Sequence, residues 1–218
     1  MSVSRRRTSR PGRGPSAMKC CWPPRGACPG SGSMPVNDKK SIRKAVRQAF
    51  PGREERDRQS AALCAQVLAW ERYRQARVIG GYMPMAHEAD VTPILLDALA
   101  AGKKLVLPRC GRPPEMSFHR VSDLAELTCG AYGLLEPPRE AENVPPEEID
   151  LLITPLEAID RRGMRLGKGG GYYDCLLAER SIFTLGMALD HQWAQTLPAE
   201  SWDRPLRAAA GTDGIILF

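Results

Sequence analysis

Residues 150–180 read DLLITPLEAIDRRGMRLGKGGGYYDCLLAER, in which a short apolar run, a glycine-rich stretch and a helix-like segment follow one another. The run DLLITP (150–155) begins at a charged residue and ends at a proline, which is typical of a buried strand. The segment 170–180 has the length and composition of a short helix. A strand that is followed, after a connection, by a helix is the building unit of a parallel sheet. This stretch therefore predicts an α/β fold.

The segments on either side repeat the alternation of strand and helix. Ile42, Val46 and Phe50 lie four residues apart and form one apolar stripe on a helix predicted over residues 36–50. Strands that alternate with helices of about ten residues indicate a mostly parallel sheet covered by helices. The other expected helices cover about 53–74, 92–102, 170–180 and 191–197, and the expected strands cover 77–82, 104–108, 116–120, 150–155, 183–189 and 214–218.

Four of the five residues from 167 to 171 are glycines, and Lys168 is the exception. Glycine loses more conformational entropy on folding than any other residue, so such a cluster indicates positive φ or a close approach to a ligand. Glycine-rich backbone that leads into a helix N-terminus binds anions, because free N–H groups and the helix dipole converge there. Arg165 and Lys168 add positive charge, so we expect a phosphate to bind here.

Asp174 lies three residues after Gly171, in the first turn of the predicted helix. A carboxylate in this position could hold a magnesium ion beside the phosphates. The stretch is not a Walker sequence, and composition alone leaves open a tight turn with incidental basic residues. The position of Asp174 favours the phosphate interpretation.

The basic charge of the chain is concentrated in its first 33 residues. The formal net charge is +6, but residues 1–33 carry seven basic side chains and no acidic one. They are too rich in Pro, Gly, Arg and Ser to bury a core, so we expect a disordered extension followed by a single, nearly neutral α/β domain over 34–218. One hypothesis is that translation naturally starts at Met34. The alternative is a basic arm that contacts RNA or anionic surfaces.

The composition also argues against several classes of protein. No apolar run approaches the roughly 18 residues that a membrane-spanning helix needs. The seven cysteines are irregularly spaced and no CxxC or histidine pair accompanies them, which argues against a disulfide framework and a zinc site. We therefore expect a protein of the reducing cytoplasm.

Several motifs follow one another in order along the domain. GMRLGKGGGYYD (163–174) is the most distinctive of them. The others are the helix with Lys39 and Arg43, YMPMAHEADVTPIL (82–95), LVLPR (105–109), AYGLLEPP (131–138), LPAESWDRPL (197–206) and GTDGIIL (211–217). Together, over about residues 36–217, these motifs resemble the 5-formyltetrahydrofolate cyclo-ligase family, also called 5,10-methenyltetrahydrofolate synthetases.

The resemblance implies a three-layer α/β sandwich with a mostly parallel sheet, similar to the sugar-isomerase and coenzyme A transferase-like group. It implies a ligase (EC 6.3.3.2) of folate and one-carbon metabolism. Such an enzyme uses ATP and Mg²⁺ to convert 5-formyltetrahydrofolate to 5,10-methenyltetrahydrofolate, with release of ADP and phosphate. Phosphorylation would make the formyl oxygen a good leaving group, so that N10 can close the ring. We expect ATP and the folate as partners, a monomer, and no nucleic acid except through the basic tail.

The resemblance also implies roles for individual residues. Lys168 and Arg165 would act on the transferred phosphoryl group, and Asp174 and Asp203 would bind Mg²⁺. The residues expected to bind ATP are Lys39, Arg43, Arg165, Gly167, Lys168, Gly169, Gly170, Gly171, Tyr172 and Tyr173. Those expected to bind the folate are Met83, Glu88, Tyr132 and Tyr172.

General chemistry agrees with these roles. Phosphoryl transfer depends mainly on positioning and charge neutralisation, which lysine, arginine and backbone N–H groups supply. A pterin ring needs aromatic or thioether contacts and a carboxylate for its amino groups. Two positions depart from the family pattern. Cys175 stands where arginine is common, and Gly170 stands where some members have lysine, which leaves Lys168 to supply more of the charge.

These residues also have interpretations that involve no ligand. Lys39 and Arg43 could form a solvated helix face, Glu88 could cap the helix near residue 92, and Asp203 could pair with its neighbour in a turn. The three histidines share no metal-binding spacing and are assigned no catalytic role. A phosphate-binding or isomerase-like module of the same fold that does not cleave ATP is the alternative function. An RNA-associated protein with a basic tail is a third.

Overall fold

The computed structural model describes residues 38–130 and 133–218. The extension expected to be disordered, residues 1–33, and the expected folate-binding residue Tyr132 lie outside this part of the chain. Among the described residues, no helix combines the length and apolar character needed to cross a membrane.

A mixed sheet of eight strands forms the centre of the fold. The strands are β1 (Val78–Gly80), β2 (Lys104–Cys110), β3 (Met116–Val121), β6 (Asn143–Val144), β7 (Leu151–Thr154), β10 (Thr184–Met187), β12 (Ala208–Gly211) and β13 (Gly214–Leu217). They lie in the order β13-β12-β10-β7-β1-β2-β3-β6. The five strands from β12 to β2 pair in parallel, and β13, β3 and β6 add antiparallel edges. The predicted α/β class with a mostly parallel sheet is confirmed.

The inner strands of this sheet are buried on both faces. In β7, Leu151 and Ile153 belong to one hydrophobic core, whereas Leu152 belongs to another. Successive side chains of a strand point to opposite faces, so these two cores lie on opposite sides of the sheet. Burial on both sides is the reason that such strands appear in the sequence as continuous apolar runs.

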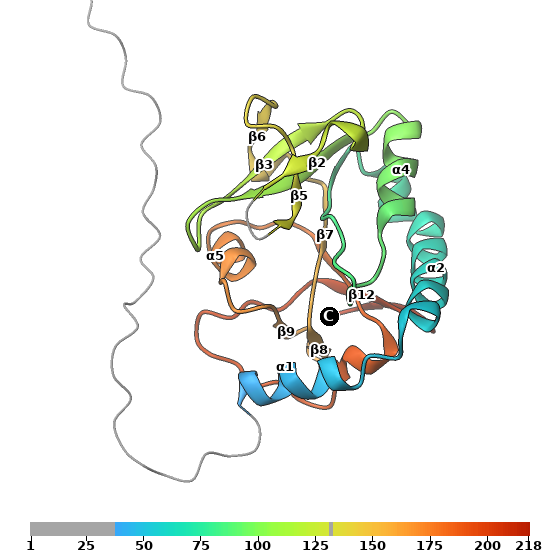
Figure 1. Cartoon of the computed structure of the whole chain (residues 1–218), viewed down its shortest axis with the longest axis vertical. Helices are drawn as coiled ribbons and strands as arrows, with labels where there is room; N and C mark the ends of the chain where they lie inside the picture. Colours follow the sequence, from blue (N-terminus) through green and yellow to red (C-terminus); the bar gives the residue numbers. More distant parts are fainter. Residues whose placement is uncertain (1–37, 131–132) are drawn as a thin grey trace, which may run out of the picture. The chain divides into compact units, whose positions relative to one another are not determined.

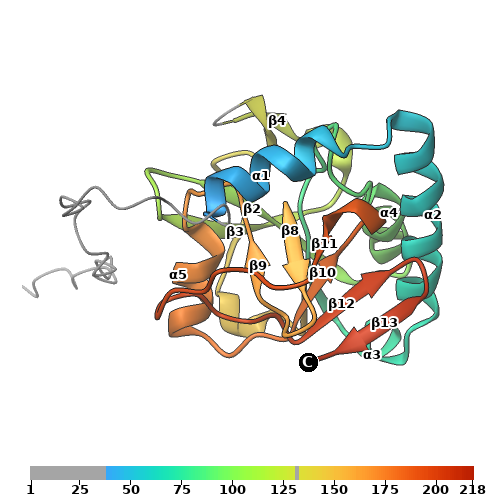
Figure 2. The same cartoon turned by 90° about the horizontal axis from the view of Figure 1, so that it is seen from below.

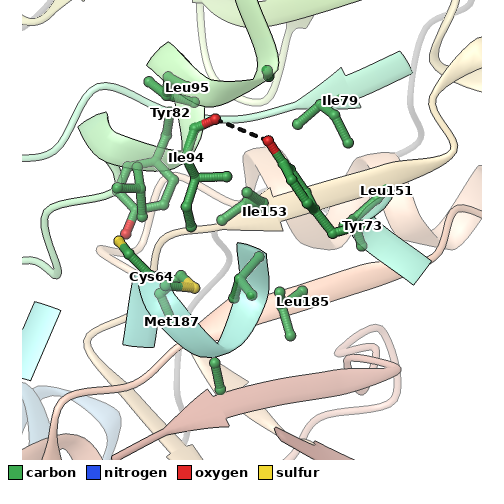
Figure 3. Close-up of a cluster of buried hydrophobic side chains, with 14 of the residues drawn as sticks. Cys64, Tyr73, Ile79, Tyr82, Ile94, Leu95, Leu151, Ile153, Leu185 and Met187 are labelled. Atoms are coloured by element: carbon green, nitrogen blue, oxygen red, sulfur yellow. Dashed lines mark hydrogen bonds between the residues drawn. The ribbon is translucent and has the colours of Figure 1, made fainter. Parts of the chain in front are cut away.

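Helices cover both faces of the sheet. Three of them, α2 (Arg53–Ala69), α3 (Glu71–Gln75) and α4 (Thr92–Ala100), pack on the core that contains Leu151. Within that core the hydroxyl of Tyr73 donates a hydrogen bond of 3.3 Å to the carbonyl of Ile94 (Figure 3). On the other face lies α5 (Tyr172–Glu179), which both views of the ribbon place away from α2 and α4 (Figures 1 and 2).

The connection that follows β7 folds into a small sheet of its own. Its strands are β8 (Ala158–Asp160), β9 (Arg165–Leu166) and β11 (Trp193–Ala194). Helix α1 (Lys39–Gln48) lies along this sheet and packs Ile42 and Val46 against it (Figure 2). The connection expected between β7 and the glycine stretch therefore contains the antiparallel hairpin of β8 and β9, and the glycine stretch follows this hairpin directly.

Two expected helices differ from the structure. The helix expected over 53–74 ends at Ala69, because Trp70 adopts an extended conformation (ψ 129°) and packs its indole on the core beside Phe183. The segment 191–197 is not a helix. It forms a short 3₁₀ turn and β11, because the buried side chain of Gln192 bonds the backbone of Leu189 and Leu156.

Several strands were not predicted from the sequence. The most central is β12, in which three consecutive alanines are fully buried. Alanine is depleted in strands generally, so its sequence shows no β signal. Ala208 and Ala210 pack in one core and Ala209 packs in another, so the strand is identified by its packing and not by its composition. The remaining short elements are β4 (Thr128–Cys129), β5 (Leu135–Glu136), η1 (Leu124–Glu126), η3 (Pro146–Glu148) and η4 (Asp190–Gln192).

Candidate active site

A cavity of about 420 Å³ opens at the carboxyl ends of three neighbouring parallel strands, β7, β1 and β2. Its walls include Pro155 directly after β7, Tyr82 and Met83 shortly after β1, and Pro108 and Cys110 near the end of β2. Ligands of open α/β sheets bind at this edge, where the loops after the strands converge.

The glycine stretch forms one side of the cavity. All five residues from 167 to 171 line it as the chain passes from β9 to α5. Gly169 has a φ of 100°, and Gly171, which immediately precedes α5, has a φ of 73°. Other residues rarely adopt such angles, which explains the glycines. The N-terminus of α5 thus opens at the cavity, where its dipole and free N–H groups favour an anion.

Arg165 supplies a buried positive charge beside this helix terminus. Its Nη2 lies 3.2 Å from Oδ1 of Asp174, and its Nη1 donates to the carbonyl of Pro155 at 3.3 Å. The guanidinium carbon lies 5.1 Å from the ring centre of Tyr173, within the range of a cation–π contact. Nε of Arg165 is buried and has no hydrogen-bond partner in the described part of the chain. A buried donor without a partner is costly, and water or a ligand would have to satisfy it.

Lys168 reaches across the cavity to the loop that follows β1. Its Nζ lies 2.8 Å from Oε1 of Glu88 and also contacts the sulfur of Met85. The other carboxylate oxygen of Glu88 accepts a 2.8 Å hydrogen bond from the backbone N–H of Met85. A lysine expected to bind phosphate and a glutamate expected to bind the pterin are therefore in direct contact across this cavity.

Helix α1 places two more cations at the cavity. Its first turn is capped by Asp38, whose carboxylate accepts from two backbone N–H groups. The Nζ of Lys39 lies 2.6 Å from Oδ2 of Asp203 and 2.9 Å from Oε2 of Glu200. Burial alone would lower the pKa of Lys39, but these hydrogen bonds raise it above its ordinary value. Arg43 donates from Nε to the carbonyl of Gly167 at 2.7 Å, which ties the helix to the glycine stretch.

Two carboxylates at the cavity are of the kind that binds magnesium. Asp174 and Asp203 both line it, and each shows a contact with a cation through one oxygen only. Magnesium is commonly held by one or two carboxylates together with phosphate oxygens and water. No group of three or more metal-ligating side chains occurs within 38–130 and 133–218, so phosphates would have to complete the coordination.

The cavity is also lined by apolar and aromatic side chains. Met83, Tyr172 and Tyr173 line it, and the hydroxyl of Tyr172 donates to the carbonyl of Gly111 at 3.1 Å. Burial raises the pKa of Tyr173 above the ordinary value of a phenol. A flat heterocycle can bind between such side chains.

The structure adds residues that the sequence analysis did not single out. Met85, Met116 and Leu135 line the cavity, and so does the buried carboxylate of Glu136. Glu136 accepts a hydrogen bond of 3.1 Å from the backbone N–H of Cys110. It lies in the motif AYGLLEPP, so the motif itself was the available signal.

The predicted site residues are brought together with one exception. Tyr132 lies outside the described residues. All the others line the single cavity described above: Lys39, Arg43, Met83, Glu88, Arg165, Gly167, Lys168, Gly169, Gly170, Gly171, Tyr172, Tyr173, Asp174 and Asp203. These predicted residues come from four separate parts of the sequence. Their individual roles stay predictions.

Comparisons with known proteins agree on one family. The sequence model of the 5-formyltetrahydrofolate cyclo-ligase family matches residues 35–211. The 5-formyltetrahydrofolate cyclo-ligase of Escherichia coli K12 is 31% identical over 176 residues, which are 77% of this chain and 94% of that protein. The probable 5-formyltetrahydrofolate cyclo-ligase of Schizosaccharomyces pombe is 28% identical over 73% of this chain and 87% of its own.

Solved structures give the same result. The NMR structure of Aquifex aeolicus 5,10-methenyltetrahydrofolate synthetase matches with a TM-score of 0.73 and 32% identity, over 82% of this chain and 92% of that one. The 5,10-methenyltetrahydrofolate synthetase of Mycoplasma pneumoniae has a TM-score of 0.65 at 22% identity, over 80% of this chain and 99% of its own, and supports the fold.

Proposed function

Because the chain belongs to the 5-formyltetrahydrofolate cyclo-ligase family, we propose that its cavity binds ATP and 5-formyltetrahydrofolate side by side. The chain is a cyclo-ligase that converts 5-formyltetrahydrofolate to 5,10-methenyltetrahydrofolate. The observation that carries the proposal is the convergence of α1, the loop after β1 and the glycine stretch on one cavity. Cations and the N-terminus of α5 line this cavity together with thioether and aromatic side chains.

The phosphates of ATP would bind between α1 and the glycine stretch. Lys39 and Arg43 approach from the helix, and Lys168 approaches from the loop. Arg165 offers its unpaired Nε and would hold charge on the transferred phosphoryl group. Such fixed donors stabilise the transition state of phosphoryl transfer, because they are already oriented when charge develops.

The folate would bind against the apolar and aromatic side chains of the cavity. Met83 and Tyr172 would contact the pterin ring, and Glu88 would accept hydrogen bonds from its amino groups. Tyr132 is proposed to stack on the substrate. Since Glu88 and Lys168 touch each other, this arrangement brings the formyl group and the γ-phosphate next to each other.

The proposed reaction transfers the γ-phosphoryl group to the formyl oxygen and releases ADP. N10 of the folate then attacks the formyl carbon, the bond to the phosphorylated oxygen breaks, and phosphate leaves while N10 loses its proton to water. Lys168 and Arg165 would hold the phosphoryl oxygens throughout. Asp174 and Asp203 would hold Mg²⁺, which neutralises phosphate charge when it is bound.

Other features of the resemblance belong to the same proposal. We infer a three-layer sandwich related to the sugar-isomerase and coenzyme A transferase-like group, because helices lie on both faces of the sheet. We also infer a cytoplasmic monomer with ATP and the folate as its partners.

The test is the absorbance of the methenyl product, followed with purified chain in the presence and absence of ATP and Mg²⁺. We expect product only with both, and one ADP for each product molecule. Cyclisation without ATP, or phosphate binding without turnover of the formyl folate, would instead support the alternative of a phosphate-binding or isomerase-like module.

A further inference from the structure

A buried carboxylate lies behind the cavity, outside the set of residues assigned to the two substrates. It belongs to Glu157, which directly precedes β8 and whose side chain is only 1% exposed. Burying a charged carboxylate is costly unless ion pairs and hydrogen bonds compensate for the lost water. The partners of Glu157 therefore indicate what the charge does.

The first partner is Arg47 of α1. Its Nε lies 3.1 Å from Oε2 of Glu157 and its Nη2 lies 3.2 Å from Oε1, which is a two-pronged pair. Arg47 follows Arg43 by four residues, so both side chains lie on the same face of the helix. The pair with Glu157 thus holds the part of α1 that presents Arg43 to the glycine stretch.

The second partner is His87, in the loop after β1. Its Nε2 lies 3.3 Å from Oε1 of Glu157. His87 immediately precedes Glu88, the carboxylate that contacts Lys168 in the cavity. The backbone N–H of Glu157 itself donates to the carbonyl of Leu166 at 2.8 Å, next to Arg165 in β9.

The carboxylate stays charged in this position. Burial raises the pKa of Glu157, but the hydrogen bond and charge of Arg47, together with His87, outweigh burial and hold the pKa below its ordinary value. Arg43 is also within electrostatic range of Glu157. One negative charge thus connects α1, the loop after β1 and the hairpin, and each of these elements carries a residue of the cavity.

We propose that Glu157 is a positioning residue that holds two elements of the site in place through two separate contacts, one with Arg47 and one with His87. Each contact is called an arm below. The arm through Arg47 holds α1, and with it the cations assigned to ATP. The arm through His87 holds the loop that presents Glu88 to the folate. The inference rests on the proposed function, because it concerns the affinities for these two substrates.

The experiment breaks one arm at a time and measures dissociation constants for both substrates. Arg47→Met keeps most of the side-chain stem and removes the charge, and we expect it to weaken ATP binding about 3- to 30-fold with little change for the folate. His87→Ala should show the reverse, with weaker binding of 5-formyltetrahydrofolate. Glu157→Gln should weaken both, and Arg47→Met should add little in a Glu157→Gln background.

Asp160, the last residue of the strand that Glu157 directly precedes, provides a matched control. It is a fully buried carboxylate paired with Arg162 at 2.7 Å, and Arg162 is 55% exposed, compared with 53% for Arg47. This pair holds the hairpin turn and the backbone N–H of Leu197, and it reaches neither α1 nor the loop after β1. Arg162→Met should lower the melting temperature as much as Arg47→Met does while leaving both dissociation constants unchanged.

The outcomes separate the two proposals. The positioning role would be overturned if Arg47→Met and His87→Ala each weakened the binding of both substrates equally. It would also be overturned if neither variant changed a dissociation constant more than Arg162→Met does. Both single variants replace partly exposed side chains and are expected to fold even if Glu157→Gln does not. A wild-type chain that binds both ligands but forms no methenyl product would count against the proposed function, and the split in dissociation constants would still decide the role of Glu157.

Discussion

Three cations in the cavity each contact a carboxylate. The pairs are Lys39 with Asp203, Arg165 with Asp174, and Lys168 with Glu88. ATP is strongly anionic, so it would draw the cations toward its phosphates and leave the carboxylates in need of new partners. Magnesium at Asp174 and Asp203, and pterin amino groups at Glu88, would be such partners. Each carboxylate would therefore keep a partner with and without substrates, which avoids the cost of a buried charge without a partner.

Lys168→Ala should lower turnover and the affinity for ATP. Removal of a charge-assisted contact to the transferred phosphoryl group should cost about 2–4 kcal/mol, or about 30- to 1000-fold in kcat/KM for ATP. Stability should fall by only about 1 kcal/mol, because water in the cavity can replace the lysine at Glu88. Methenyl formation across ATP concentrations and the melting temperature check both expectations.

Lys104→Ala is the matched control for that variant. Lys104 pairs with Glu148 at 3.1 Å at the start of β2, away from the cavity-lining residues. We expect it to leave the kinetics unchanged. Near-wild-type kinetics of a folded Lys168→Ala protein would mean that the glycine stretch is a structural turn.

Asp174→Asn should largely abolish turnover without unfolding the chain. The amide oxygen can still accept from Arg165, so the contact in the fold is kept, whereas a neutral amide is a poor magnesium ligand. The check is turnover during a titration with Mg²⁺, with the melting temperature as control. If activity at limiting Mg²⁺ equals that of the wild type, Asp174 is not a metal ligand.

At the scale of the element, the glycine stretch depends on its backbone conformation. Gly169 has a positive φ, and an added Cβ would lie 3.6 Å from Nη2 of Arg43. Gly169→Ala should cost about 1–2 kcal/mol of stability, because L-residues are strained in this region of φ and ψ. It should also weaken ATP binding, because the loop would shift relative to α1.

Gly102→Ala is the control that separates the effect of backbone strain on stability from an effect on ATP binding. Gly102 has a φ of 69°, its added Cβ would meet nothing within 4 Å, and it lies just after α4, outside the cavity-lining residues. We expect a similar loss of stability and unchanged ATP binding. Thermal unfolding together with ATP titration of both variants makes the comparison. Equal ATP binding by the two would show that the conformation at Gly169 matters only for folding.

At the scale of the whole molecule, residues 1–33 should be dispensable. Their composition cannot bury a core, and the basic residues in them have no acidic neighbours in sequence. A chain that starts at Met34 should keep the melting temperature and turnover of the full chain. Salt-sensitive RNA binding that disappears with residues 1–33 would support the basic-arm alternative. A clear fall in stability or turnover would show that the extension contributes to the domain.

The sequence by itself determined the α/β class, the glycine stretch at the start of a helix and the family to which the chain belongs. These features depend on local signals: apolar runs bounded by Pro and Gly, apolar residues four apart, and glycines whose conformation other residues avoid. The six expected strands are all present in the sheet, with shifts at their ends. The same local signals failed for the alanine strand β12, whose residues show no preference for a strand.

Tertiary structure alone decided which distant charges meet. Lys168 contacts Glu88 and Glu157 joins Arg47 to His87, although these residues are far apart in the sequence. No periodicity or motif marks Glu157, because a buried carboxylate is recognisable only by its surroundings. The end of a helix before Trp70 and the turn at Gln192, where a helix was expected, likewise depend on contacts with residues far away in the sequence. Packing and buried hydrogen bonds are worth more than local propensity, and they form only when the chain has folded.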